Sequence, residues 1–238
     1  MITSLDNKKV KEWTKLHLKK YRKEECLLLS PEAVSAAKET RYLKTLIYTG
    51  EPPFEHPESY EVSKEVMRKI TDGKDLSYCA TASMIKESED WGRRVLILDH
   101  LQDPLNIGRI METALLFGFD SIILSEGSAD ITHERVLEES RGALYHLHIS
   151  IGDLKEKISL LKQKGFKVYA TGLRGETKEL HDVTESEKMA FILGNEGSGV
   201  SEEIMDIADE IVKIDMDNID SLNVAMAGAI IAYRFRLL

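Results

Sequence analysis

Cysteine, long apolar runs and a leader segment are scarce or absent in this sequence of 238 residues. Its two cysteines, Cys26 and Cys79, lie far from each other and from histidines at metal spacing, so we expect buried, neutral thiols, no disulfide framework and no metal site. No apolar run reaches the roughly 18 residues of a membrane span, and the polar, basic N-terminus lacks a signal-peptide core. These absences predict a cytoplasmic globular protein without membrane attachment, and its 42% hydrophobic content suffices for a full core.

The charge balance is acidic, but one segment is strongly basic. A net charge of −9 argues against a nucleic-acid partner, because phosphate binding depends on Lys and Arg. Residues 8–23 nevertheless hold eight basic residues and a single acid, Glu12. Apolar residues recur there at near-helical spacing, namely Val10, Trp13, Leu16 and Tyr21. The pattern predicts a basic amphipathic helix, which is either a solvated surface helix or an arm that faces RNA through Lys11, Lys15, Lys19, Arg22 and Lys23.

The sequence divides into two regions of different character. The first region is mixed, with a strand expected at residues 43–48, a helix at 63–70 and an apolar stretch at 76–82. A charged segment that contains Gly92 follows, and it predicts a domain boundary. We therefore expect one domain over residues 1–90 and a second over residues 91–238.

Short aliphatic runs and helical patterns alternate throughout the second region. The expected strands are residues 95–98, 121–124, 145–149, 167–171, 189–193 and 211–214. The expected helices are residues 106–117, residues 154–164, a helix that begins at Ser201, and residues 221–235. This alternation predicts an α/β fold with a parallel sheet covered on both faces. Because the last helix is apolar almost all round, we expect it to be buried, with a subunit interface as a natural candidate.

The position of the glycine-rich turn disfavours a dinucleotide-binding enzyme. The turn after the first strand of the second region, residues 99–108, is not GxGxxG. The glycine-dense loop that follows a strand and opens a helix instead comes late, at residues 194–199. It lacks the Lys of a P-loop, and Glu196 would repel a phosphate. Exposed amides beside a carboxylate suit a ligand with an adenine, hydroxyls and positive charge, such as S-adenosylmethionine.

Three segments carry a resemblance to a known family. They are Asp-Pro-Leu-Asn-Ile-Gly at residues 103–108, Phe-Ile-Leu-Gly-Asn-Glu-Gly-Ser-Gly at 191–199, and Ile-Asp-Met at 214–216 followed by Ser-Leu-Asn-Val-Ala at 221–225. In order and spacing these segments resemble the three motifs of the SpoU/TrmH RNA ribose 2′-O-methyltransferases of the SPOUT superfamily. The first region resembles, more weakly, the ribosomal-protein-like substrate-binding domain of many members.

The resemblance implies an α/β fold whose C-terminal part forms a deep trefoil knot, a homodimer, and S-adenosylmethionine-dependent methylation of rRNA or tRNA. By position, the cofactor would be held by Thr171, Gly194, Glu196, Gly197, Ile214 and Leu222. The knot and the reacting end would be ordered by Asn106, Glu196, Ser221 and Asn223. For Ile214 and Leu222 a role in the core is equally compatible, because a backbone contact leaves the side chain free to pack.

The sequence departs from the family pattern at the residue expected to assist catalysis. Glu112 stands where members carry an arginine, which reverses the local charge. Two further departures are Glu138, where relatives often carry a basic residue, and Asp215, where the third motif usually has proline. Three substitutes are conceivable: Arg109 one helical turn earlier, Arg141 beside Glu138, or Glu112 itself as a general base.

Glu112 is otherwise an ordinary helix glutamate, solvated or paired with Arg109. Two hypotheses therefore lead: a working RNA ribose methyltransferase, or a catalytically impaired cofactor-binding knot that acts in RNA binding or regulation. An α/β enzyme of another kind is a third.

Overall fold

The computed structural model describes residues 1–216 and 222–237, which fold as two compact units. The first unit comprises Met1–Ile85 and Asp130–Tyr145, and the second comprises Lys86–Ala129 and His146–Leu238. The division after Ile85 lies five residues before the predicted boundary at residue 90. The inclusion of residues 130–145 in the first unit was not predicted from the sequence.

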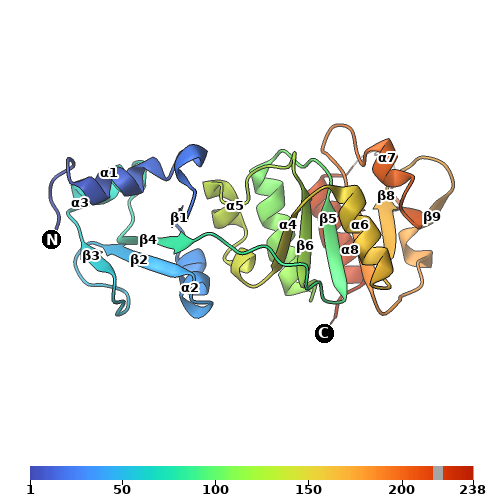
Figure 1. Cartoon of the computed structure of the whole chain (residues 1–238), viewed down its shortest axis with the longest axis horizontal. Coiled ribbons are helices and arrows are strands. Elements are labelled where there is room, and N and C mark those ends of the chain that lie inside the picture. The colour runs from blue at the N-terminus through green and yellow to red at the C-terminus, as the bar shows by residue number, and fades with distance from the viewer. Residues whose placement is uncertain (217–221, 238) are drawn as a thin grey trace. The chain divides into compact units, whose positions relative to one another are not determined.

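The first unit is built on a four-stranded sheet with the order β1-β4-β2-β3 (Figure 1). Strands β1 (Glu25–Leu28) and β2 (Leu43–Tyr48) both pair antiparallel with β4 (Tyr78–Ser83), whereas β3 (Ser59–Glu61) pairs parallel with β2. Its other elements are α1 (Lys8–Lys15), η1 (Lys19–Tyr21), α2 (Pro31–Glu39), α3 (Lys64–Ile70), α5 (Glu134–Glu139) and η2 (Ala143–Tyr145). Both cysteines are buried, as predicted, and burial raises the pKa of Cys26 to about 11 and that of Cys79 to about 12.

The predicted continuous basic helix over residues 8–23 is wrong. Helix α1 ends at Lys15, and Leu18 is already extended before the short turn η1. The reason is Arg22, which is buried and donates from Nη1 to the carbonyls of Leu16 (3.1 Å) and His17 (3.0 Å), so the chain must turn back. Tyr21, expected on the apolar face, is consequently 42% exposed.

The second unit has a seven-stranded sheet with the order β7-β6-β5-β10-β8-β11-β9, in which every described pairing is parallel. Its strands are β5 (Arg94–Leu98), β6 (Ser121–Ser125), β7 (His148–Gly152), β8 (Lys167–Thr171), β9 (Thr177–Glu179), β10 (Met189–Leu193) and β11 (Glu210–Lys213). Its helices are α4 (Pro104–Leu116), α6 (Leu154–Gln163), η3 (Leu180–Asp182), α7 (Glu202–Met205) and α8 (Val224–Arg234). The predicted α/β fold with a parallel sheet is confirmed.

Helices cover both faces of this sheet. On one face, α6 and α7 pack through Ile158 and Ile204 against Val95 and Ile97 of β5 and neighbouring strands. On the other face α4 contacts α8, and Phe235 just after α8 stacks on Phe191 of β10 with ring centroids 4.8 Å apart. Burial on both faces explains why these strands read as unbroken aliphatic runs.

Two predicted boundaries in the second region are displaced. Strand β7 begins at His148 rather than at residue 145, because Tyr145 belongs to η2 and is buried in the first unit, beside Cys26 and Tyr42. Helix α8 begins at Val224 rather than at residue 221, with Asn223 as its cap, and its Oδ1 accepts from the amide of Ala225 at 2.9 Å. Ser221 itself lies outside the described residues.

Candidate functional site

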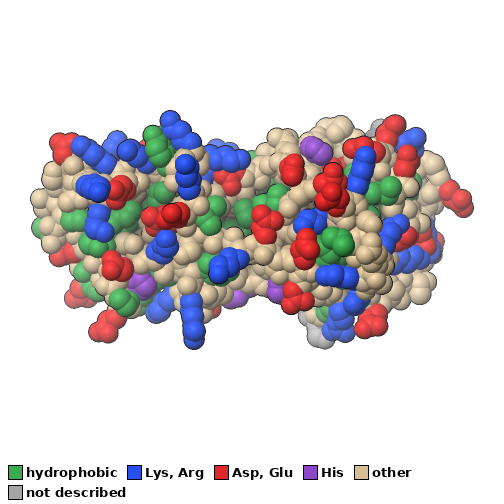
Figure 2. All heavy atoms as spheres, viewed as in Figure 1, with side chains coloured by type: hydrophobic (Ala, Val, Ile, Leu, Met, Phe, Trp, Pro, Cys, Tyr) green, Lys and Arg blue, Asp and Glu red, His purple; other side chains and the backbone are tan. Residues whose placement is uncertain are grey.

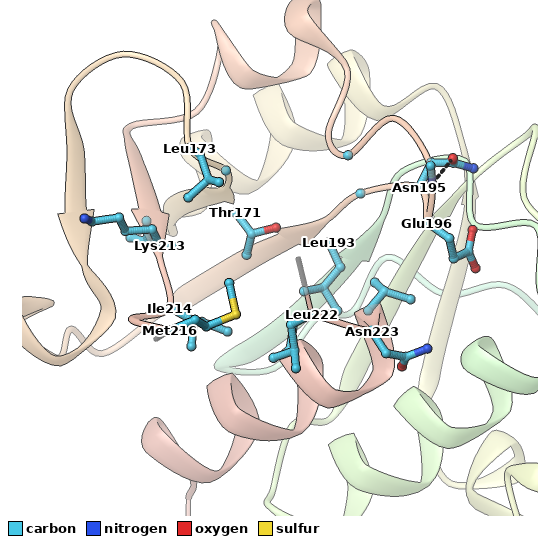
Figure 3. A pocket seen from close by; sticks show the side chains of 17 residues that line it. Thr171, Leu173, Leu193, Asn195, Glu196, Lys213, Ile214, Met216, Leu222 and Asn223 are labelled. Atoms are coloured by element: carbon cyan, nitrogen blue, oxygen red, sulfur yellow. Dashed lines mark hydrogen bonds between the residues drawn. The ribbon is translucent and has the colours of Figure 1, made fainter. Parts of the chain in front are cut away.

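A pocket of about 390 Å³ opens at the carboxyl ends of β8, β10 and β11 (Figure 3). In open parallel sheets, ligands bind at the carboxyl edge of the strands, and this volume falls within the range of small-molecule sites. Two chain segments that follow β10 and precede α8 complete its wall. The lining residues include all six predicted cofactor contacts: Thr171, Gly194, Glu196, Gly197, Ile214 and Leu222.

The wall of the pocket combines backbone groups with aliphatic side chains. In Figure 3 the side chains of Thr171, Leu173, Met216 and Leu222 surround the space, while Glu196 lies at its far side near Asn223. The Oγ1 of Thr171 donates to the carbonyl of Ile192 at 2.9 Å, so this hydroxyl ties β8 to β10. Among the residues that the structure describes, the pocket therefore offers a largely apolar slot with one carboxylate, that of Glu196, at one end.

The glycine loop is closed by Asn195. The Asn195 amide donates to the Gly199 carbonyl at 3.0 Å and the Gly199 amide donates back to Asn195 at 2.9 Å. Its Oδ1 also accepts from the amides of Gly197 (2.9 Å) and Ser198 (3.3 Å). From the sequence we expected exposed backbone amides in this loop. The amides of Gly197 and Ser198 instead donate to Asn195 within the loop, so they stabilise its shape rather than face a ligand.

Gly194 permits the close approach of two backbone segments. A Cβ atom at this position would lie 2.0 Å from the amide nitrogen of Val200 and 2.1 Å from the carbonyl carbon of Gly199. Backbone atoms cannot yield as the end of a flexible side chain does. A side chain at residue 194 would therefore push the whole loop out of place.

Asn106, Glu196 and Asn223 form a hydrogen-bonded chain that joins the three motif segments. Asn106, which is 3% exposed at the start of α4, donates from Nδ2 to Glu196 Oε1 at 3.1 Å. Its Oδ1 accepts from Asn223 Nδ2 at 3.2 Å. Glu196 also accepts from the amides of Gln102 (3.4 Å) and Asp103 (3.3 Å). Residues 90 and 117 positions apart in the sequence are thereby fixed at one end of the pocket.

These contacts decide the charge of Glu196. Partial burial alone would raise the pKa of its carboxyl, but the backbone amides and the Asn106 amide group bind the carboxylate and hold its pKa below the usual value. Glu196 is therefore an anion at neutral pH. An anion at the end of an apolar slot favours a ligand with positive charge there.

None of the predicted residues of the first helix, Asn106, Arg109 and Glu112, lines the pocket, and Asn106 reaches it only through its hydrogen bonds with Glu196 and Asn223. Arg109 is exposed and Glu112 half-buried on α4, and neither is without an interaction partner. Glu138 and Arg141 belong to the first unit, where Glu138 is bound by Lys74 and Arg141 contacts Glu32 at 3.4 Å. The sequence reasoning missed Leu173 and Lys213 in the wall, although both closely follow or end predicted strands at the same edge of the sheet.

A small polar cluster lies beside the pocket at the edge of the sheet. The ligand atoms of Glu179, His181 and Asp215 lie within 4.8 Å of one another. The contact with Glu179 raises the pKa of the Asp215 carboxyl. Lys213 Nζ lies 2.5 Å from Glu179 Oε1 and supplies a counter-charge, so we interpret the cluster as an ion-pair network.

Comparison with known proteins places this geometry in a family. Residues 93–233 match the SpoU rRNA Methylase family. Over 99% of its length the chain is 31% identical to the 23S rRNA (guanosine(2553)-2′-O)-methyltransferase RlmP of Bacillus subtilis, 98% of which is covered. A further relative is an uncharacterized tRNA/rRNA methyltransferase of Borreliella burgdorferi, 32% identical over 60% of this chain and 63% of that protein.

Two solved structures have the same fold. One is a putative RNA methyltransferase of the TrmH family from Porphyromonas gingivalis, with a TM-score of 0.87, 26% identity and 98% of each chain covered. The other, with a TM-score of 0.88 and 24% identity, is an AdoMet-bound rRNA methyltransferase from Sinorhizobium meliloti, and it covers 98% of this chain and 95% of that one. The resemblance inferred from the three motifs is confirmed: the chain belongs to the SpoU rRNA methylase family.

Proposed function

We propose that this chain transfers the methyl group of S-adenosylmethionine to a ribose 2′-hydroxyl of ribosomal RNA. The observation that carries the proposal is the pocket lined by the second and third family motifs, to which hydrogen bonds from Asn106 to Glu196 and Asn223 join the first motif. The relative in Bacillus subtilis, similar to this chain from end to end, is named for that reaction on 23S rRNA. Nothing in the comparisons favours a catalytically impaired knot protein.

The residues of the pocket fit this cofactor. The aliphatic wall of Leu173, Ile214 and Leu222 suits the faces of an adenosine, and backbone groups at Gly194 can meet its polar edge, with Gly197 beside them in the wall. The anionic Glu196 suits the positive end. When bound, the cofactor supplies an activated methyl group, so the protein's own residues have only to orient the acceptor hydroxyl and handle its proton.

The acceptor side of the reaction is assigned to the start of α4 and the cap of α8. Asn106 and Asn223 hold Glu196 in place, while Arg109 and Glu112 lie one and two turns further along α4. Arg109 takes the place of the missing family arginine in this proposal, as the cation that orients a substrate phosphate or stabilises the developing alkoxide. Ser221, the fourth residue assigned to this end, lies outside the described residues.

RNA is held by the first unit in this proposal, which acts as the substrate-binding domain. Lys11, Lys15, Lys19, Lys23 and Arg141 supply its positive charge, and Figure 2 shows Lys and Arg side chains gathered along the edge of that unit where α1 lies. Arg22, predicted to touch RNA, is excluded by its burial and its ion pair with Asp130 at 2.8 Å.

The proposal includes a homodimer and a knotted C-terminal segment. Apolar side chains on α4 and α8 are exposed in the single chain: Leu116 at 67%, Met226 at 60%, Ile230 at 41% and Tyr233 at 58%. A contiguous apolar surface of this kind is typical of a subunit interface. Residues 194–199 and Leu222 line one pocket, as a knot around the cofactor requires. An rRNA substrate places the reaction in the cytoplasm.

None of the helices in the described parts of the chain is long and apolar enough to cross a membrane.

The test is transfer of labelled methyl from S-adenosylmethionine to 23S rRNA. We expect incorporation at a ribose, recognised because a 2′-O-methyl group blocks alkaline cleavage of the next phosphodiester bond. Leu222→Arg should abolish transfer, since Leu222 is 37% exposed in the wall of the pocket and arginine there adds bulk and positive charge. Leu5→Arg is the matched control, 40% exposed in the first unit. Label on bases alone, or none with any rRNA despite bound cofactor, contradicts the proposal.

A further inference from the structure

The turn that follows α1 displays two apolar side chains in the most basic part of the sequence. Leu18 is 54% exposed and Tyr21 is 42% exposed, whereas Val10, Trp13 and Leu16 of the same segment are buried in the core. Two ammonium groups lie close to the Tyr21 ring, with Lys15 Nζ at 5.4 Å and Lys20 Nζ at 5.1 Å from its centroid. Because both side chains are exposed, packing of the core does not explain why residues 18 and 21 are apolar.

The buried side chain of Arg22 fixes the conformation of this turn. Its guanidinium donates to Thr132 Oγ1 at 3.1 Å and to Asp130 Oδ2 at 2.8 Å, besides the two carbonyls that end α1. Burial alone would raise the pKa of the Asp130 carboxyl, but its hydrogen bonds with Arg22 and Thr132 keep the pKa below the usual value, so the pair stays charged. The turn is therefore preorganised, and a ligand that binds Tyr21 does not have to order it.

The lysines around Tyr21 are not neutralised by the protein. Among the described residues, no carboxylate lies within 4.0 Å of the ammonium groups of Lys15, Lys19, Lys20 or Lys23. By contrast, Lys8 and Lys11 on the preceding turns pair with Glu12 and Asp6. In a chain with a net charge of −9, this turn is thus a local concentration of positive charge beside an exposed ring.

We propose that Tyr21 is a stacking platform for an unpaired base of the substrate RNA, with Lys15 and Lys20 binding the flanking phosphates. Proteins recognise single-stranded RNA by stacking splayed bases on aromatic rings inside basic surfaces, and this turn provides both elements. A membrane surface fits less well, because a membrane-binding helix needs a continuous apolar face and here that face is buried in the core. The inference rests on the proposed function only in taking RNA as the substrate.

The test is fluorescence anisotropy of the full-length chain with a labelled RNA hairpin that has an unpaired loop, and with a blunt duplex of the same stem. Tyr21→Ala should weaken binding of the loop hairpin about tenfold or more, and Tyr21→Phe should bind like the wild type, because stacking needs the ring and not the hydroxyl. Duplex binding should not change. Since Tyr21 is exposed, both variants should melt at the wild-type temperature.

The lysines have a separate readout. In a plot of the logarithm of the RNA association constant against the logarithm of the salt concentration, the double variant Lys15→Ala/Lys20→Ala should have a slope smaller in magnitude by about two. Lys44→Ala, which removes an exposed lysine of the same unit, should leave the slope nearly unchanged. Equal losses for Tyr21→Ala and Tyr21→Phe, an unchanged affinity for Tyr21→Ala, or stronger binding to phosphatidylserine vesicles than to the hairpin would each overturn the proposal.

Failure of this inference is distinguishable from failure of the proposed function. In methyl transfer, Tyr21→Ala should raise KM for RNA and leave kcat unchanged, because Tyr21 belongs to the first unit and not to the pocket. If the wild-type chain methylates no RNA, the proposed function fails, while the anisotropy measurements still decide whether Tyr21 stacks on a base.

Discussion

Substitution of Gly194 by alanine tests whether the glycine loop shapes the pocket. The new Cβ would lie 2.0 Å from Val200 N and 2.1 Å from Gly199 C, and real Cβ atoms essentially never approach closer than 3.0 Å. The loop must therefore move by about 1 Å. Overpacking of this kind costs about 1–3 kcal/mol, which lowers Tm by about 2–12 °C in a chain of this size.

The same displacement should reach the cofactor and the reaction. Because residues 194–199 form one wall of the pocket, we expect Gly194→Ala to weaken binding of S-adenosylmethionine by about tenfold or more, measured by equilibrium dialysis. A misplacement of about 1 Å can cost about 100-fold in rate, so kcat/KM for methyl transfer should fall by that order.

Gly197→Ala is the matched control in the same loop. A Cβ there would meet only Asn195 Oδ1, at the ordinary contact distance of 3.5 Å. We expect an unchanged Tm and a loss of cofactor affinity smaller than that of Gly194→Ala. Equal affinities for Gly194→Ala and the wild type, or equal losses in the two variants, would refute the argument from backbone contact.

Three further predictions concern the charge, the catalytic group and the assembly. Arg109→Gln should lower kcat/KM about 100-fold and Glu112→Gln much less; the reverse order in methyl-transfer kinetics would make the Glu112 carboxylate the base. Because the pKa of Glu196 is lower in the folded than in the unfolded chain, its ionised carboxylate stabilises the fold. This contribution to the free energy of unfolding should be complete above the unfolded pKa of about 4.3 and lost as the pH falls through the lower folded pKa. In thermal melts, Glu196→Gln should therefore reduce the fall of Tm with decreasing pH over this range. Ile230→Glu should convert a dimer to a monomer by light scattering, with an unchanged mass counting against this interface.

Local sequence pattern predicted the buried sheet well. Strands β2, β8 and β10 begin and end at the predicted residues. For β8 and β10 the reason is burial on both faces of the sheet, whereas in β2 only Leu46 and Ile47 are buried. The site residues were predicted from the resemblance of three motifs to the SpoU/TrmH family, and Thr171, Ile214 and Leu222 do line the pocket. Thr171 and Ile214 meet there because the carboxyl ends of parallel strands lie at one edge of the sheet.

Long-range contacts account for what the sequence did not reveal. Helix α1 ends at Lys15 because Arg22 turns inward to bind Asp130, which is 108 positions away in the sequence. The hydrophobic periodicity of residues 8–23 carries no information about that ion pair. The late start of β7 has the same origin, because Tyr145 is buried against Cys26 of the first unit. Segments whose partners are remote in the sequence are those for which local pattern failed.

Isothermal titration calorimetry of the full-length chain with S-adenosylmethionine shows whether the pocket beside the glycine loop holds the methyl donor. We predict saturable binding of one cofactor per chain, lost in Leu222→Arg and retained in Leu5→Arg. No saturable heat with the wild-type chain, or undiminished binding in Leu222→Arg, would contradict it.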